Sequence, residues 1–291
     1  MNYRNILKAG AILLASATLT LTACKKNNNS TGTPALTNSD DNGGYASDAA
    51  RMETNSNDVI SIADMAKSSG SANLRVTSGG GYPTVTFAAS GGDTTMTINF
   101  GTTPFLCRDL RYRSGEILVT YNGPYKATGT VRTITYNSYF VDSNQITGSK
   151  TVTNEGTNDS GQVYYNVTVN DSMILNGTDS IVTWTGTRIR TWLAGYTSSD
   201  WSSAVYSIAN GSGAATVLRR ADGNVFTFNI TTPLIIAMDC PYIEAGTIDV
   251  SSTSFVHGDR ILDYGSTSSP TCDAAATLTI DGITYSITLR R

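Results

Sequence analysis

The residues of this chain best suited to chemistry are four cysteines and one histidine, spread over 291 residues. The cysteines are Cys24, Cys107, Cys240 and Cys272, and the histidine is His257. A cysteine thiol can accept a lipid, form a disulfide or bind a metal ion. A histidine can act as general base for a serine nucleophile. Which of these reactions is open to the chain depends on the residues around each side chain.

Because the chain has a single histidine, any serine-hydrolase chemistry must use His257. Ser251, Ser252 and Ser254 precede it, and Asp259 follows two residues later. However, no Gly-x-Ser-x-Gly turn precedes a helix, so the usual strained turn that exposes a nucleophilic serine is missing. We expect His257 to lie in a hairpin loop without a catalytic role.

Paired carboxylates are the second catalytic possibility. Asp239, Glu244 and Asp249 lie close together in sequence, but nothing holds two of them at the separation of about 5 or 9 Å that a glycosidase needs. The segment that begins at Asn38 imitates a calcium loop, yet Ala49 stands where a bidentate glutamate is required. The sequence therefore predicts no enzyme, no metal and no cofactor.

A repeated motif indicates which of three cysteines, Cys107, Cys240 and Cys272, form a disulfide. Ile98-Asn-Phe-Gly101 is followed by Cys107-Arg-Asp109, and Leu262-Asp-Tyr-Gly265 is followed by Cys272-Asp273. Asp239-Cys240-Pro241 stands upstream of the second copy, whereas the matching place upstream of the first has no cysteine. We predict a Cys240–Cys272 disulfide and a free Cys107. The alternative is a bond from Cys107 to one of the other two, which would clamp the two ends of the domain.

The fourth cysteine, Cys24, ends a short apolar segment. Arg4 and Lys8 precede residues 9–21, which are too few for a bilayer-spanning helix of roughly 20 residues. Leu21-Thr22-Ala23-Cys24 resembles the lipobox of bacterial lipoproteins. This resemblance implies that residues 1–23 are a signal peptide and that Cys24 carries a lipid that anchors the protein to a membrane. The alternatives are an ordinary secretory signal with an incidental cysteine, or a buried helix.

Composition limits the partners and the number of domains. Cleavage before Cys24 would remove two of the 20 basic side chains and none of the 23 acidic ones, leaving a net charge of about −5. Such a charge argues against a nucleic-acid partner, which needs a basic surface. Residues 24–45 are nearly all polar and predict a disordered tether. Residues 46–291 are long enough for a single β-rich domain.

One helix and many strands must position these residues. Ser47 can cap a helix, and apolar residues then recur at helical spacing, which predicts a helix over residues 47–68. The remaining chain alternates β-branched or aromatic residues with polar ones, in short runs separated by Asn-Gly and Asp-Gly. The predicted fold class is all-β: an antiparallel meander forming a curved sheet or a sandwich, with one N-terminal helix.

Several motifs occur in a recognisable order: Arg113-Ser-Gly-Glu-Ile-Leu-Val-Thr-Tyr, Trp184-Thr-Gly-Thr-Arg, Asp239-Cys-Pro and Asp263-Tyr-Gly. Their order resembles a family of uncharacterised β-rich lipoproteins of the Bacteroidota. That family has Asp-Gly-Arg where this chain has Asp109-Leu110-Arg111, so the turn is altered here. The resemblance implies an exported protein anchored to the outer membrane by lipid, on its periplasmic or its cell-surface face, and implies no activity.

Aromatic side chains offer a possible ligand face for a glycan or a protein partner. The candidates are Tyr125, Tyr139, Tyr164, Trp192 and Trp201. The alternative is that they pack in the core or across strands. We expect a lipid-anchored envelope protein with a non-enzymatic structural or binding role. The second hypothesis is a glycan-binding or adhesion lipoprotein, and the third is a hydrolase that uses His257.

Overall fold

The computed structural model describes residues 41–75, 81, 83–178, 180–198, 200–219, 223–255 and 257–289. The predicted signal peptide, Cys24 and most of the predicted tether lie outside these residues. All described elements belong to one compact unit, Thr33–Arg291. Fold and site are therefore properties of this unit.

The unit contains one long helix and one sheet. The α-helix α1 spans Asp41–Ser69, and two short 3-10 helices follow, η1 at Ala72–Leu74 and η2 at Trp201–Ser203. The strands are β1 Thr84–Ser90, β2 Asp93–Asn99, β3 Phe105–Leu106, β4 Tyr112–Tyr121, β5 Val131–Val141, β6 Asn144–Thr157, β7 Val163–Ile174, β8 Ile181–Ala194, β9 Val205–Asn210, β10 Ala215–Arg219, β11 Val225–Ala237, β12 Ala245–Ser251, β13 Arg260–Asp263, β14 Ala275–Ile280 and β15 Ile283–Thr288.

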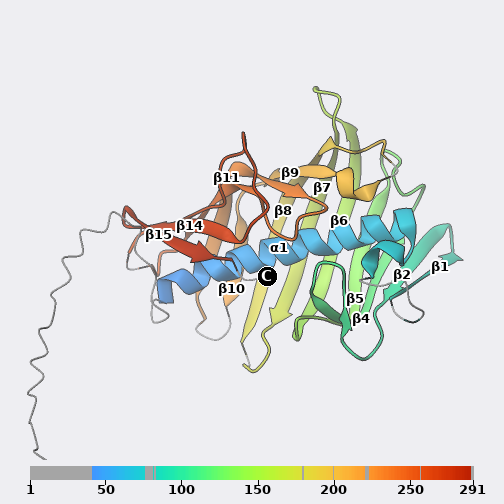
Figure 1. Ribbon diagram of the computed structural model, residues 1–291, viewed down its shortest axis with the longest axis horizontal. Coiled ribbons are helices and arrows are strands. Elements are labelled where there is room, and N and C mark those ends of the chain that lie inside the picture. The colour runs from blue at the N-terminus through green and yellow to red at the C-terminus, as the bar shows by residue number, and fades with distance from the viewer. Residues whose placement is uncertain are drawn as a thin grey trace, which may run out of the picture. The chain divides into compact units, whose positions relative to one another are not determined.

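The 15 strands form a single antiparallel sheet in which chain neighbours are nearly always sheet neighbours. The short strands β9 and β10 share one place in the order, because both pair with β8 and with β11. β1 and β15 lie at the two ends of the sheet, and α1 crosses the strands between them (Figure 1). The predicted all-β antiparallel meander with one helix is confirmed.

The helix begins earlier than its sequence pattern indicates. It starts at Asp41 rather than at residue 47, so residues 41–45 of the predicted tether are helical. The Tyr45 ring packs against Phe226 and Phe255, with ring centroids 5.4 and 5.0 Å away. Helical stability in proteins comes mostly from tertiary packing. This packing therefore extends the helix through glycines that disfavour it.

The sheet bends through bulges. The register between β4 and β5 shifts between Ser114 and Glu116, at Gly115, whose φ is 78°. A Cβ atom on Gly115 would lie 1.9 Å from the carbonyl oxygen of Ser138, so only glycine fits there. Because a bulge bends its strand and increases the local twist, these shifts curve the sheet toward α1.

Candidate functional site

Carboxylates of α1 form ion pairs with arginines of the sheet. Glu53 accepts a hydrogen bond from Nε of Arg188 on β8 at 3.0 Å, and both side chains are buried. Asp64 accepts one from Nη1 of Arg132 on β5 at 2.7 Å. The pairs seen among the described residues are Asp48–Arg219, Glu53–Arg188, Asp58–Arg111, Asp58–Arg113 and Asp64–Arg132.

The positions of these carboxylates show how the sheet surrounds α1. At about 100° per residue, Glu53 and Asp58 lie about 140° and 280° around the helix axis from Asp48. No single flat face could reach all three. The arginine partners of Asp48 and Glu53 lie on β10 and β8. The partners of Asp58 are Arg113 on β4 and Arg111, the residue before β4. The sheet therefore curves around the helix. Carboxylates on several sides of the helix are therefore ion-paired and mostly buried.

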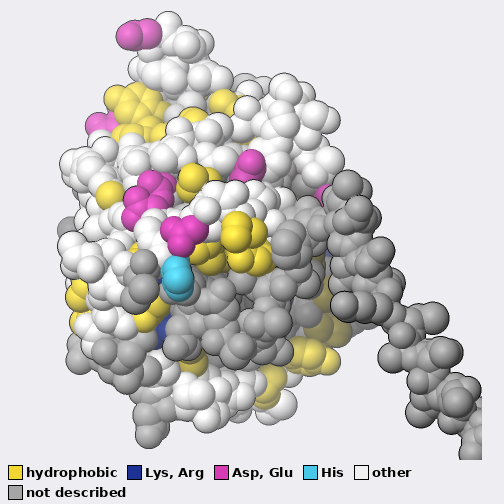
Figure 2. Space-filling view, turned by 90° about the vertical axis from the view of Figure 1, so that its left-hand side faces the viewer, with side chains coloured by type: hydrophobic (Ala, Val, Ile, Leu, Met, Phe, Trp, Pro, Cys, Tyr) yellow, Lys and Arg dark blue, Asp and Glu magenta, His cyan; other side chains and the backbone are white. Residues whose placement is uncertain are grey.

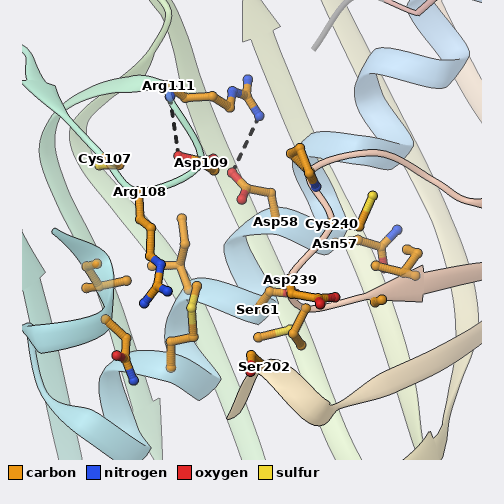
Figure 3. Close-up of a pocket in the computed structure, with 18 of the residues that line it drawn as sticks. Asn57, Asp58, Ser61, Cys107, Arg108, Asp109, Arg111, Ser202, Asp239 and Cys240 are labelled. Carbon is orange, nitrogen blue, oxygen red and sulfur yellow. Dashed lines mark hydrogen bonds and ion pairs between the residues drawn. The ribbon is translucent and has the colours of Figure 1, made fainter. Parts of the chain in front are cut away.

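A cavity of about 420 Å³ opens beside the C-terminal half of α1. One side of the cavity is formed by α1 and η1 (Figure 3). The other sides are formed by three segments: the turn after β3, the short helix η2 and the loop after β11. We call this cavity the Arg108 pocket. Its lining includes Met65, Arg108, Leu110, Trp201, Met238 and Asp239.

The floor of the Arg108 pocket is apolar. Ile62, Leu74, Ile236 and Ile243 line it, and the first three of these belong to α1, η1 and β11. Met65 and Met238 add flexible thioether side chains, which adapt to different ligand shapes. A cavity of this size and lining is typical of small-molecule sites.

Most charges beside the pocket are already paired. Arg113 donates to both carboxylate oxygens of Asp109, at 2.7 and 2.6 Å, and to Asp58 at 2.6 Å. Burial opposes ionisation of Asp109, but the charge and hydrogen bonds of Arg113 outweigh it and lower the pKa of Asp109. Arg111 donates to Asp142 at 2.8 Å. These groups form an ion-paired network, in which Nη1 of Arg111 is buried 3.5 Å from Asp58 without a hydrogen bond.

Two charged side chains of the pocket stand outside this network. Arg108 is exposed, and its guanidinium lies 5.4 Å from the centre of the Trp201 ring. Asp239, in the loop after β11, is also exposed. Within the described ranges, neither side chain has an ion pair or a hydrogen bond. Among the described residues that line the pocket, Arg108 and Asp239 are thus a cation and an anion that have no hydrogen bond or ion pair. The charge of Arg108 also acts on Asp200 and contributes to its lowered pKa, after the hydrogen bonds from Ser202.

Leu110 lies at the rim of the pocket and is 66% exposed. Its φ is 64°, a left-handed conformation that glycine adopts freely and that costs other residues about 1 to 2 kcal/mol. Costly backbone conformations gather at binding sites. The exposed leucine adds apolar surface next to Arg108.

The predicted aromatic ligand face is wrong for three of its five members. Tyr125, Tyr139 and Trp192 are buried, because the sheet curves and brings their side chains into the core. Tyr164 is half-buried on β7, next to the buried Tyr165. Only Trp201 lines the Arg108 pocket, so these residues do not form one surface.

His257 lies on the surface, where Figure 2 shows the histidine beside acidic side chains. Its Nδ1 lies 3.0 Å from Oδ2 of Asp281. Its carboxylate partner in the described structure is thus Asp281, and not Asp259, which is nearer in sequence. In the part of the chain that the structure describes, no serine hydroxyl hydrogen-bonds to His257. In the described structure, His257 and Asp281 therefore form a pair of exposed side chains on the surface.

The three candidate glycosidase carboxylates, Asp239, Glu244 and Asp249, fall into two electrostatic groups. Burial, and then the charge of Asp239, raise the pKa of Glu244. Burial, and then the charge of Asp259, raise the pKa of Asp249. Glu244 and Asp249 therefore have different acidic neighbours.

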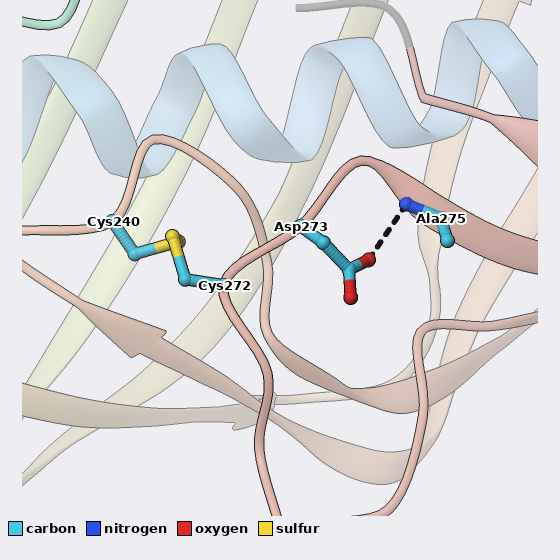
Figure 4. The surroundings of a disulfide bond; sticks show 4 residues. All are labelled: Cys240, Cys272, Asp273 and Ala275. Carbon is cyan, nitrogen blue, oxygen red and sulfur yellow. Dashed lines mark hydrogen bonds between the residues drawn. A yellow bond between two sulfur atoms is a disulfide. The ribbon is translucent and has the colours of Figure 1, made fainter.

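The cysteine prediction is confirmed. Cys240 and Cys272 are joined in a disulfide (Figure 4). Cys107 is free and buried. The alternative bond from Cys107 is wrong. Glu244 lies near both disulfide sulfurs, but sulfurs bonded to each other cannot supply thiolate ligands to a metal ion. Because Cys240 also lines the Arg108 pocket, the disulfide braces one wall of that pocket.

Burial raises the pKa of Cys107 from an ordinary 9.0 to about 11. At pH 8 the native protein then holds about 100-fold less thiolate than an exposed cysteine. We expect Ellman's reagent to label native Cys107 at least about 100-fold more slowly than the unfolded chain, measured in a Cys24→Ser background. Equal rates before and after unfolding would contradict this burial.

The sequence pattern missed the pocket and the ion pairs. A signal for the ion pairs was present, because acidic residues recur every five or six positions along α1 at residues 48, 53, 58 and 64. The pocket had no comparable signal. Its walls come from residues 54–74, 100–113, 201–202 and 236–243, which only the fold brings together.

Comparisons with protein-family models, curated proteins and solved structures find no match to this chain. The resemblance to the Bacteroidota lipoproteins therefore stays a prediction. Among the residues that the structure describes, no helix is both long and apolar enough to cross a membrane.

Proposed function

We propose that this chain is a lipid-anchored binding protein of the bacterial outer membrane, with the Arg108 pocket as its ligand site and without enzymatic activity. The observation that supports a binding role is the pocket itself, a cavity of about 420 Å³ that combines an apolar floor with the exposed charged side chains of Arg108 and Asp239. The lipobox resemblance of residues 21–24 supports the anchor. Glycan binding by the aromatic residues is not proposed again, because most of them are buried.

The binding role can be tested with N-phenyl-1-naphthylamine, a neutral apolar dye that fluoresces when it leaves water. We expect residues 33–291 to bind the dye, because the pocket floor is apolar. Met65→Trp should fill the pocket and weaken dye binding at least about tenfold. Leu193→Trp places the same side chain on an exposed part of β8 and should leave binding unchanged. Equal dye binding by both variants would refute the pocket as a ligand site.

The anchor can be tested in cells. We expect the full chain to incorporate labelled palmitate and to sediment with outer membranes, and Cys24→Ser to abolish both. Added protease would distinguish the two membrane faces, because only a cell-surface domain is cut in intact cells. An unlabelled full chain that does not sediment with membranes would refute the lipid anchor.

A further inference from the structure

The ligand class follows from the two unpaired charges. Among the described arginines, Arg108 alone is exposed, and the others lie in or at the edge of the core. Its five N–H donors suit a carboxylate, which a guanidinium can bind with two parallel hydrogen bonds. The Trp201 ring supports one side of the guanidinium and leaves its other donors available. This wall of the pocket is therefore suited to a carboxylate.

Asp239 has the opposite preference. Its carboxylate accepts no hydrogen bond within the described part of the chain, so it is available to an ammonium group. A fatty acid or another simple anion would satisfy Arg108 but would lie near the unpaired negative charge of Asp239. A ligand that carries both charges satisfies both walls.

The places of the two residues decide how far apart the ligand's charges must be. Figure 3 shows Arg108 and Asp239 on different sides of the pocket, on the turn after β3 and on the loop after β11. A free amino acid carries its ammonium and carboxylate on one carbon atom. A peptide separates them by up to about 3.3 to 3.6 Å for each residue.

We propose that the Arg108 pocket binds a short peptide with apolar side chains, whose C-terminal carboxylate pairs with Arg108 and whose N-terminal ammonium pairs with Asp239. The peptide side chains lie on the apolar floor, against Met65 and Met238. The exposed Leu110 contacts the peptide at the rim. This inference rests on the proposed binding function and names the ligand class of the same site.

Calorimetric titration of the full chain with four probes tests the proposal. The probes are trileucine, trileucine amide, acetyl-trileucine and octanoate. We expect trileucine to bind, and capping of either end to weaken binding at least about tenfold, because each cap removes one charge pair. Octanoate, which has an apolar body and a carboxylate but no ammonium, should bind more weakly than trileucine.

Substitutions assign each charge to its partner. Arg108→Gln should weaken trileucine at least about tenfold while hardly changing the affinity for the amide. Asp239→Asn should likewise weaken trileucine at least about tenfold while hardly changing the affinity for acetyl-trileucine. Asp159→Asn removes an exposed carboxylate from the loop between β6 and β7 and serves as the control. Both tested side chains are exposed, so neither substitution removes a core contact.

Four results would overturn the proposal. Tighter binding of octanoate than of trileucine would identify an anionic amphiphile as the ligand class. If capping either end of trileucine and substituting Arg108 or Asp239 leave the affinity unchanged, recognition of the peptide's charges is refuted. If the apolar dye binds and Met65→Trp blocks it while trileucine does not bind, the peptide inference alone fails. If Met65→Trp does not affect the dye, the proposed function fails as well.

Discussion

Glu53→Leu is expected to lower the free energy of unfolding by about 3 to 5 kcal/mol, because it leaves a buried arginine without its counterion. Glu53 is 0% exposed and Arg188 is 2% exposed, so water cannot replace the lost partner. Arg188 also lies over the Phe228 ring, 4.6 Å from its centre, in the middle of the core. A domain is typically stable by only about 5 to 15 kcal/mol, so the loss is a large share of the total.

Urea unfolding followed by tryptophan fluorescence measures this effect. The double variant Glu53→Leu/Arg188→Met removes both charges and keeps apolar volume, and it should recover most of the loss. Glu155→Gln, an exposed substitution on β6, should change the stability by no more than about 0.5 kcal/mol. A double variant no more stable than Glu53→Leu would show that the cost does not come from the unpaired arginine.

Cys240→Ser/Cys272→Ser is expected to lower the free energy of unfolding by about 3 to 4 kcal/mol in the chain-entropy account. The bond joins two residues 32 positions apart, so it keeps a loop closed in the unfolded chain and lowers the conformational entropy of that state. Without the bond the unfolded chain regains this entropy, and the folded state is less favoured. The same variant should bind the apolar dye more weakly, because Cys240 holds a wall of the Arg108 pocket.

Denaturant unfolding of the oxidised and the chemically reduced protein provides the comparison. Reduction of the unsubstituted chain should cause the same loss as the double substitution, and it should have no effect on the substituted chain. Cys24→Ser should be neutral, because Cys24 is not part of this disulfide. Identical unfolding midpoints for the oxidised and reduced chains would contradict a stabilising bond.

Local pattern was enough to predict the strands and the disulfide. Strands such as β7, with alternating buried and exposed residues from Tyr165 to Met173, follow a period of two that is visible in the sequence. The disulfide was predictable because the repeated motif around Cys107 and Cys272 left one cysteine without a counterpart. Both inferences depend on near neighbours or on a repeat, which a linear sequence displays directly.

The surroundings of α1 were not predictable in the same way. Its pattern predicted a helix from apolar residues at helical spacing, but it did not indicate that the polar residues Glu53 and Asn57 are buried and that Asp58 is mostly so. A curved sheet supplies arginines on several sides of the helix. Whether an acidic side chain is solvated or ion-paired depends on strands more than 100 residues away, such as β8 for Glu53.

By itself, the sequence determined an antiparallel meander, one helix, a Cys240–Cys272 disulfide and a free Cys107, because side-chain alternation and repeats act locally. Only the tertiary structure decided that the helix is enclosed, that most candidate aromatics are buried, and that Arg108 and Asp239 share a pocket. The physical reason is the curvature of the sheet. Bulges such as the one at Gly115 add small bends that accumulate over 15 strands, and their sum decides which distant side chains meet.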